Sequence, residues 1–380
     1  NKNSRFDMFS QINTPKDLIP TDPRFGAGPS KVPVEFIEKL LSTKANLLGT
    51  SHRKPAVKNL GMEITNGLKE YFKLPEDYCV VYGNGGATLL FDMIGLGMVE
   101  KESSHFTCGE FSRKWFKSHD KIPWIQAEEI NVDFGQGQSF GDCRNSASDM
   151  ICVTLNETST GVIIDDLPTI REDQILAVDA TSGGGQVPCD LSKVDLFFFS
   201  PQKVFASEGG LFVAIMSPKA RERALKIGSD ANRYFPDIMS WKQAIDNSDK
   251  FQVYNTPSIS TLFFLNEQIK LMNEVGYENV VAKGNELSSF IYNWAESKPY
   301  LSPFIEEKKY RSNVVCTINV DEKYPVSELL SKLHEEKVVY GIESYRKLGK
   351  NQFRIGVFHN VDKNDVIKLT QLLSYYIENA

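Results

Sequence analysis

Two apolar runs decide the fold: Gln174-Ile-Leu-Ala-Val-Asp179-Ala-Thr-Ser182 and Leu196-Phe-Phe-Phe-Ser200-Pro-Gln-Lys203. Short, almost unbroken apolar runs of this kind are typical of strands buried on both faces of a parallel sheet. Each run delivers one charged residue at or just beyond its carboxyl end, Asp179 in the first and Lys203 in the second. Ligands of open parallel sheets bind at that edge. The two runs therefore predict a sheet and a binding site together.

The surrounding chain alternates between strand-like and helix-like stretches. We expect strands at 79–82, 150–155, 174–178, 196–199 and 211–216, and helices at 87–99, 113–119 and 218–227. Such alternation predicts an α/β fold in which a mostly parallel sheet is covered by helices on both faces.

The pattern changes after Asn255-Thr-Pro257, where 258–275 and 279–297 read as two long helices separated by Gly276. The order that follows is strand, helix, strand, helix at 314–320, 327–336, 352–358 and 363–379, which suits a small α+β domain. We expect an N-terminal arm at 1–22, a large domain at 23–270 and a small C-terminal domain at 271–380.

Composition excludes several classes of function. The 380 residues carry 43 Lys and Arg against 49 Asp and Glu, a net charge of -6, so a broad basic surface for nucleic acid or an anionic membrane is not expected. The six cysteines lack C-x-x-C spacing, which predicts free thiols in a reducing compartment and neither a metal site nor a disulfide framework. Without a run of about 18 apolar residues or a secretory signal, we expect a cytoplasmic protein.

Asp179 and Lys203 together suit one kind of cofactor. A pyridine ring needs a carboxylate to keep its nitrogen protonated and an amine to form an imine, and two strand ends can supply both. The alternative is a turn aspartate and a solvated loop lysine. The Gly-rich segment 206–211 favours the first interpretation, because it places Lys203 in a compact turn.

Ser200-Pro-Gln-Lys203 also matches the S-x-x-K motif of penicillin-recognising serine enzymes. In those enzymes the serine opens a helix, which Pro201 and the strand pattern oppose here. The companion motifs S-D-N and K-T-G do not occur in the sequence.

Two Gly-rich segments resemble anion-binding turns. Gly83-Asn-Gly-Gly-Ala-Thr88 follows a predicted strand and opens a predicted helix, so its backbone N–H groups could hold a phosphate. Gly26-Ala-Gly-Pro-Ser-Lys31 lacks a preceding strand, and we interpret it as a turn of the chain.

From about Arg24 to its end, the sequence resembles the phosphoserine aminotransferases, in the actinobacterial-type subgroup of the class V branch of fold-type I pyridoxal-phosphate enzymes. The order and spacing of nine segments carry the resemblance: Arg24-Phe-Gly-Ala-Gly-Pro-Ser30, Thr50-Ser-His-Arg53, Gly85-Gly-Ala-Thr88, Gly109-Glu-Phe-Ser112, Asn156-Glu-Thr158, Val178-Asp-Ala180, Pro201-Gln-Lys203, Tyr254-Asn-Thr-Pro257 and Tyr345-Arg-Lys-Leu-Gly-Lys-Asn-Gln-Phe-Arg354.

The resemblance implies a set of residues around pyridoxal 5'-phosphate. Lys203 would carry the cofactor covalently and move the substrate proton, and Asp179 would pair with the ring nitrogen. Phe111, where the wider family often has Trp, would stack on the ring. The remaining contacts, mainly to the cofactor phosphate, would come from Ala87, Thr88, Thr158 and Gln202 of one subunit and from Asn255 and Thr256 of its neighbour. A homodimer with shared active sites is therefore implied.

The resemblance also implies two cationic anchors for a doubly anionic substrate. Arg354 would bind the α-carboxylate, while His52 and Arg53 would bind the distal phosphate or carboxylate, often across the dimer. Other branches carry a His shortly before the clamp arginine, where this sequence has Tyr345-Arg346. Whether Arg53, Lys54 or Arg346 provides the main phosphate contact stays open.

The activity implied is amino transfer between L-glutamate and 3-phosphohydroxypyruvate in serine biosynthesis, with a phosphorylated four-carbon substrate of pyridoxine biosynthesis as a second possibility. Alternatives are another class V transaminase, such as an alanine–glyoxylate or serine–pyruvate enzyme, and a non-catalytic ligand-binding protein of the same fold. The His52–Arg53 pair argues against the first alternative, and the Asp179, Lys203 and Phe111 set argues against the second.

Overall fold

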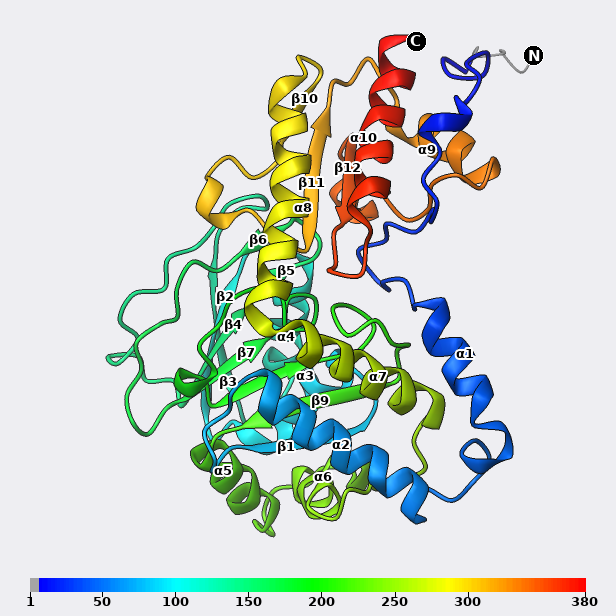
Figure 1. The fold of residues 1–380 in the computed structure, drawn as a ribbon. Coiled ribbons are helices and arrows are strands. Elements are labelled where there is room, and N and C mark those ends of the chain that lie inside the picture. Colours follow the sequence, from blue (N-terminus) through cyan, green and yellow to red (C-terminus); the bar gives the residue numbers. More distant parts are fainter. Residues whose placement is uncertain (1–6) are drawn as a thin grey trace, which may run out of the picture.

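The computed structural model describes residues 7–380, and its central element is a seven-stranded sheet (Figure 1). The strands lie in the order β1 (Cys79–Asn84), β9 (Leu211–Met216), β8 (Leu196–Phe199), β7 (Ile175–Asp179), β4 (Met150–Thr154), β2 (Glu102–Thr107) and β3 (Gln126–Asn131). Strand β9 runs antiparallel to β1 and β8, and the other neighbours are parallel. The predicted mostly parallel sheet is confirmed. Sequence analysis did not single out β2 and β3, because both are rich in polar residues.

Helices cover both faces of this sheet, as its apolar strands require. Neighbouring strand residues alternate between two cores: Val153 and Val178 belong to one, Cys152 and Ala177 to the other. The first core is closed by α1 (Val34–Ser42), α2 (Pro55–Tyr71) and α7 (Ile259–Val275), and the second by α3 (Ala87–Met98), α4 (Glu110–Asp120), α5 (Pro218–Gly228) and α6 (Trp241–Ser248).

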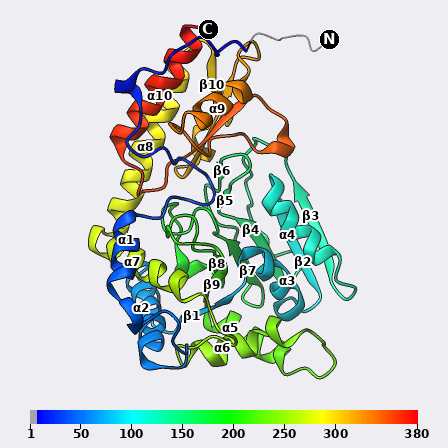
Figure 2. The same ribbon diagram turned by 90° about the vertical axis from the view of Figure 1, so that its right-hand side faces the viewer.

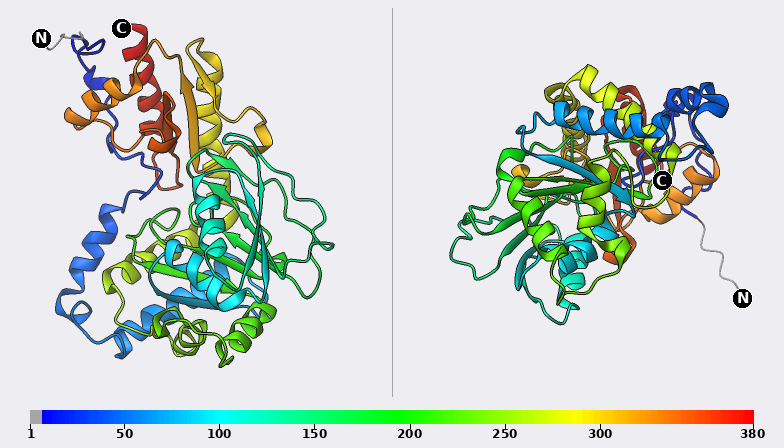
Figure 3. Two further views of the ribbon diagram at one scale, coloured as in Figure 1. Left: turned by 180° about the vertical axis from the view of Figure 1, so that it is seen from behind. Right: turned by 90° about the horizontal axis from the view of Figure 1, so that it is seen from below.

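A second, smaller unit stands above the large sheet when the molecule is seen from behind (Figure 3). It combines an antiparallel sheet, β10 (Leu301–Pro303), β11 (Val315–Val320) and β12 (Gln352–Gly356), with α8 (Tyr277–Ser297), α9 (Val326–Glu335) and α10 (Lys363–Glu378). A two-stranded ribbon of β5 (Asn156–Glu157) and β6 (Val162–Ile163) lies between the two sheets (Figure 2). The short 3-10 helices are Lys16–Leu18, Lys44–Asn46, Leu191–Lys193, Asp237–Met239, Lys308–Tyr310 and Arg346–Leu348.

The chain start packs on the small unit. Phe9 and Phe25 are buried in the small-unit core, and the ring of Phe9 contacts that of Tyr376 on α10. Residues 1–6 of the expected arm lie outside the described residues. The predicted domain boundary near 270 falls within α7, whose Ile269 and Met272 belong to the large-unit core. We propose Gly276, between α7 and α8, as the point of division.

Candidate active site

Lys203 and Asp179 both lie at the carboxyl edge of the large sheet. Asp179 is the last residue of β7, and Lys203 follows the end of β8 by four residues. The Lys203 Nζ donates a hydrogen bond to the carbonyl of Ala27 at 2.9 Å. Burial lowers the pKa of Lys203, the charge of Arg354 lowers it further and Asp179 acts in the opposite direction, and together they bring this pKa to about 8. The amine is therefore neutral in a substantial fraction of molecules near pH 8, as a nucleophile must be.

The Asp179 carboxylate is buried, with 3% of the residue exposed. It accepts hydrogen bonds from the backbone N–H, at 3.0 Å, and the hydroxyl of Thr181. Burial raises the pKa of Asp179 to about 6, although the Thr181 hydrogen bonds and the charge of Lys203 pull it down. Within the described chain, no ion pair joins Asp179 to a lysine or arginine. A buried carboxylate with a raised pKa and no ion pair is stabilised when a cationic group binds next to it.

These two residues share one cavity of about 420 Å³. Seven of the residues predicted from the sequence line it: Ala87, Thr88, Phe111, Thr158, Asp179, Gln202 and Lys203. The other lining residues are Gly85, Gly86, Leu89, Phe91, Asn156, Thr181, Ser182, Ser200 and Gly210. The fold therefore brings together residues from six separate parts of the sequence.

One wall of the cavity is the amino end of α3. Gly85 and Gly86 approach this end with φ values of +134° and +152°, which L side chains rarely adopt. The Ala87 N–H donates to Ser200 Oγ at 2.8 Å, and the buried Gln202 Oε1 has no hydrogen-bond partner among the residues described. A helix N-terminus lined by polar side chains suits an anion such as a phosphate.

At two lining residues, Phe111 and Thr158, the large unit contacts the small unit. Phe111, in the first turn of α4, contacts the ring of Tyr345 edge-on at 5.8 Å between centroids. Arg354, on β12, donates to the Thr158 carbonyl at 3.1 Å, and its buried Nε has no partner within the described part of the chain. Burial lowers the pKa of Arg354 from its usual range. The guanidinium is therefore poorly satisfied by the chain, as expected of an anion-binding group.

The other predicted substrate and cofactor residues do not line this cavity. Asn255 and Thr256 are exposed, and their carbonyls accept hydrogen bonds from Asn84 Nδ2. Arg53 is exposed and donates to Gln252 Oε1 at 2.9 Å. Between residues 7 and 380, His52 Nε2 is buried without a partner; Lys54 precedes α2, and Arg346 is exposed in a 3-10 helix. One copy of the chain alone does not bring these side chains to Lys203.

Sequence reasoning missed a second wall of the site. The segment Gly26–Ser30, interpreted above as a turn, lies directly against Lys203: a Cβ atom at Gly28 would overlap the lysine amine. The Ser30 hydroxyl donates to the Lys203 carbonyl at 2.6 Å. The small residues at 26–28 were the only hint in the sequence. They could not be assigned to the site, because the contact between Ser30 and Lys203 spans 173 positions of sequence.

Two further residues of this edge were also missed. Ser200 was considered only within the S-x-x-K motif, but its hydroxyl accepts the first helical N–H of α3. Glu157 is completely buried, and burial raises its pKa to about 7, despite hydrogen bonds from Phe111, Ser159 and Ser112. In the sequence Glu157 appears only within the segment Asn156-Glu-Thr158 that carries the resemblance, and no local pattern marks its side chain as buried.

A separate buried cluster of His105, His119 and Cys152 has the composition of a metal site. The Trp115 indole N–H donates to His119 Nε2 at 3.2 Å, which leaves the hydrogen of this ring on Nδ1. That Nδ1 faces His105 Nε2 at 3.1 Å and is the nitrogen a metal would need. The cluster is therefore best explained as a hydrogen-bonded part of the core.

Comparisons with known proteins agree with this geometry. The model of the aminotransferase class V family matches residues 133–344. Phosphoserine aminotransferase of Corynebacterium glutamicum (strain R) is 42% identical over 368 residues, covering 96% of this chain and 97% of that protein. The protein of the same name from Rhodococcus opacus (strain B4) is 40% identical and covers 97% and 99%.

Among solved structures, a phosphoserine aminotransferase from Cytophaga hutchinsonii superposes with a TM-score of 0.84 at 23% identity, covering 93% of this chain and 99% of that one. An alanine–glyoxylate aminotransferase from Nostoc sp. reaches 0.78 at 18% identity and covers 99% of both chains. At these identities the structures show the shared fold, that of fold-type I enzymes. The sequence matches are more specific, and with them this chain belongs to the phosphoserine aminotransferase family of the class V aminotransferases.

Proposed function

We propose that this chain transfers an amino group between L-glutamate and 3-phosphohydroxypyruvate, giving O-phospho-L-serine and 2-oxoglutarate, with pyridoxal 5'-phosphate at Lys203. The observation that carries the proposal is the meeting of Lys203, Asp179, Phe111 and the amino end of α3 in one cavity. An amine, a carboxylate, an aromatic face and an anion cradle are what this cofactor requires. The family relationship supports the same assignment.

Each residue has a role that its surroundings support. When bound, the cofactor supplies an electron sink for the bond broken at the substrate α-carbon. Asp179 holds the proton on the ring nitrogen, and its raised pKa favours such a cationic partner. Lys203, with a lowered pKa, would take the proton from the substrate α-carbon and deliver it to the cofactor carbon that carried the imine. Ala87, Thr88, Ser200 and Gln202 hold the phosphate.

Substrate binding divides between two anchors. Arg354 binds the α-carboxylate, because its guanidinium contacts the carbonyl of the cavity residue Thr158 and its buried Nε has no partner among residues 7–380. The second anion is bound by His52 and Arg53 of a neighbouring subunit, with Lys54 or Arg346 assisting. These four residues lie outside the cavity of their own chain, which supports a site shared between two copies.

A homodimer is part of the proposal. Helix α1 stands at the outside of the molecule and exposes Val34, Ile37 and Leu41 by 53%, 49% and 77% (Figure 1). Their spacing of three and four residues puts them on one helix face, which suits burial against another subunit. Asn255 and Thr256 would then reach the partner's phosphate site. Mixing inactive Lys203→Ala and Arg53→Ala subunits should restore activity in part, because some sites would be intact.

No helix among residues 7–380 is long and apolar enough to span a membrane. The six cysteines are free thiols, which supports a reducing compartment, and we place the reaction in the cytoplasm.

Comparing O-phospho-L-serine with L-serine as amino donors to 2-oxoglutarate tests the substrate. We expect the phosphorylated donor to have a kcat/KM at least about 100-fold higher, since a charged anchor left unpaired costs several kcal/mol. Equal values would reject the phosphate anchor and favour an alanine–glyoxylate or serine–pyruvate type of enzyme. A phosphorylated four-carbon donor in the same assay tests the possible second role in pyridoxine biosynthesis.

A further inference from the structure

Glu157 is a carboxylate buried directly behind the cofactor cavity. It is the last residue of β5, and its neighbours Asn156 and Thr158 both line the cavity. None of its surface is exposed, and in the part of the chain that the structure describes, no lysine, arginine or histidine forms an ion pair with it. A buried carboxylate without a cation is costly unless hydrogen bonds satisfy it.

The hydrogen bonds come from the amino end of α4. Glu157 Oε1 accepts the N–H of Phe111 at 2.7 Å, and Oε2 accepts that of Ser112 at 3.3 Å. The hydroxyl of Ser159 accepts the N–H of Glu110 at 3.1 Å and donates to Glu157 Oε1 at 3.0 Å. The first N–H groups of a helix have no partner within it, and a negative charge there is favourable. Glu157 therefore caps α4 from a distant part of the sequence.

The residue before α4 is shaped to admit this cap. Gly109 has no side chain to cap the helix, and a Cβ atom there would overlap the Glu157 carboxylate. Its φ of 179° is extended backbone that any residue adopts, so space, not conformation, requires glycine here. Gly109 and Glu157 thus fit each other across 48 positions of the chain.

The cap determines where the ring of Phe111 lies. This ring lines the cavity, and its own backbone N–H makes the shorter of the two bonds to Glu157. A shift of the first turn of α4 would move the ring by a similar amount. An aromatic ring covers a flat cofactor effectively only at van der Waals distance, so a small displacement weakens the contact.

We propose that Glu157 is a positioning residue, which fixes Phe111 against bound pyridoxal 5'-phosphate through the first turn of α4. The inference rests on the proposed function, because it presupposes that cofactor. It assigns Glu157 no contact with cofactor or substrate.

A double-mutant cycle between Glu157→Gln and Phe111→Ala tests the coupling. The readout is the dissociation constant of pyridoxal 5'-phosphate, from titration of cofactor-free protein, with the visible circular dichroism of the bound cofactor as a second signal. We expect each single variant to raise the constant about tenfold and the double variant to raise it about tenfold as well, because both changes remove the same contact. The circular dichroism should fall equally in all three.

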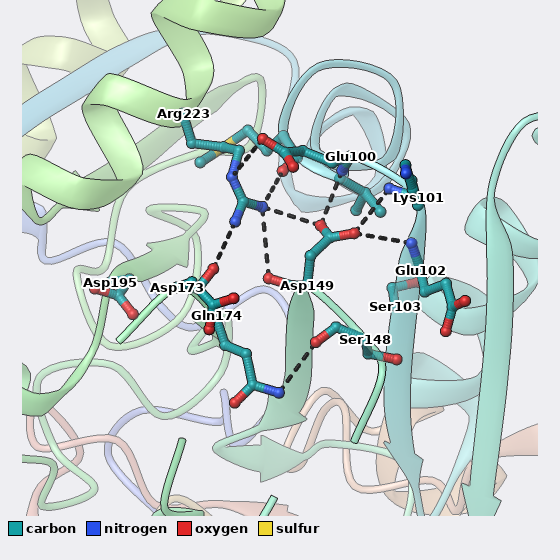
Figure 4. A network of polar contacts seen from close by, with 12 residues as sticks. Glu100, Lys101, Glu102, Ser103, Ser148, Asp149, Asp173, Gln174, Asp195 and Arg223 are labelled. Carbon is teal, nitrogen blue, oxygen red and sulfur yellow. Dashed lines mark hydrogen bonds and ion pairs between the residues drawn. The ribbon is translucent and has the colours of Figure 1, made fainter. Parts of the chain in front are cut away.

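Asp149→Asn is a matched control. Asp149 also caps backbone N–H groups, those of Glu100, Lys101 and Glu102, but at the other edge of the sheet (Figure 4). This variant should lower the melting temperature while leaving the cofactor dissociation constant within about twofold of wild type.

If Glu157→Gln lowers only the melting temperature, or if its effect multiplies with that of Phe111→Ala to about 100-fold, the inference is overturned. The proposed function would survive either result, since the wild-type protein would still bind the cofactor and turn over phosphoserine. If the wild-type protein binds no pyridoxal 5'-phosphate, both the proposed function and the inference about Glu157 are wrong.

Gly109→Ala keeps the test decisive if Glu157→Gln does not fold. The added methyl group displaces the same carboxylate from the helix side and leaves its charge in place. It should raise the cofactor dissociation constant and show the same lack of additivity with Phe111→Ala. Additive effects would count against the proposal here too.

Discussion

The two edges of the large sheet use the same residue types in opposite ways. At the amino edge, Asp149 precedes β4 and accepts three backbone N–H groups at 2.7–2.9 Å, together with Arg223 Nη1 at 3.0 Å (Figure 4). Arg223 also donates to the carbonyls of Met98 and Asp173 and pairs with Glu100. The charges of Asp149, Arg223 and Glu100 therefore all have partners from within the chain.

At the carboxyl edge, the charged side chains are held close but left incompletely paired. Asp179, Lys203 and Arg354 line or border one cavity, yet no ion pair among the described residues joins them. Burial instead moves the pKa values of Asp179 to about 6 and of Lys203 to about 8. The comparison teaches that paired charges hold this sheet together, whereas unsatisfied charges at the other edge are available to a ligand.

Lys203→Ala should have the largest effect. Loss of the amine removes both the covalent attachment and the proton-transfer group, so kcat should fall at least about 10⁴-fold. Melting temperature should change little, because among the described residues the lysine side chain makes a single hydrogen bond, to Ala27. Steady-state turnover measures the loss of kcat, and thermal unfolding measures the melting temperature. Activity within tenfold of wild type would contradict the role of Lys203.

Arg223→Met should have the opposite pattern, with a large loss of stability and little change in kcat. It leaves Asp149 without its cation in a largely buried place, and we expect the free energy of unfolding to drop by about 3–5 kcal/mol. Denaturant titration measures this loss. The kcat of the folded fraction should stay within about twofold of wild type, and a large fall in kcat at unchanged stability would break the division between the edges.

Asp179→Asn should separate function from stability. The folded-state pKa of Asp179, about 6, is above the ordinary 3.8, so the folded chain binds the extra proton. Its contribution to stability is therefore lost as pH rises from about 4 to 6 and stays lost above that range. At pH 8 the cofactor-free variant should be more stable by about 1–3 kcal/mol, with kcat reduced at least about 100-fold. A destabilised variant would show that Asp179 is a structural group.

Arg354→Met should give the smallest effect of the four variants, a shift in the pKa of Lys203. Burial is the main cause of the lowered lysine pKa, and Arg354 is the second, so the variant should raise that pKa without restoring its ordinary value. Cofactor attachment needs the neutral amine. The pH midpoint of attachment to cofactor-free protein should therefore move upward from about 8 in the variant. A downward move would show that Arg354 does not act on Lys203 by its charge.

Much of the carboxyl edge could be predicted from the sequence. Apolar runs predict the strands, and the end of each strand predicts the position of one polar side chain. Asp179 and Lys203 were found in this way, and the Gly-rich turn before α3 was found from the residues that follow β1. Edge strand β3 was missed, because its polar residues, Glu128 and Glu129 among them, leave no apolar alternation to recognise.

Other site residues depend on contacts that no local pattern records. Ala27 and Gly28 reach Lys203 from 176 and 175 positions away, in a segment without periodicity. Glu157 gains its meaning from the helix end that lies opposite it. Four residues have proposed roles in the active site of a second copy of the chain, so these roles stay predictions: His52, Arg53, Asn255 and Thr256.

Borohydride reduction of the protein with bound pyridoxal 5'-phosphate, followed by peptide mapping, tests the central claim most directly. Reduction locks the cofactor onto the lysine that carries it. We predict one modified peptide, with the pyridoxyl group on Lys203, and no such peptide when phosphoserine is added before reduction in the absence of an amino acceptor. Modification of another lysine, or of none, would contradict the assignment of the carboxyl edge as the active site.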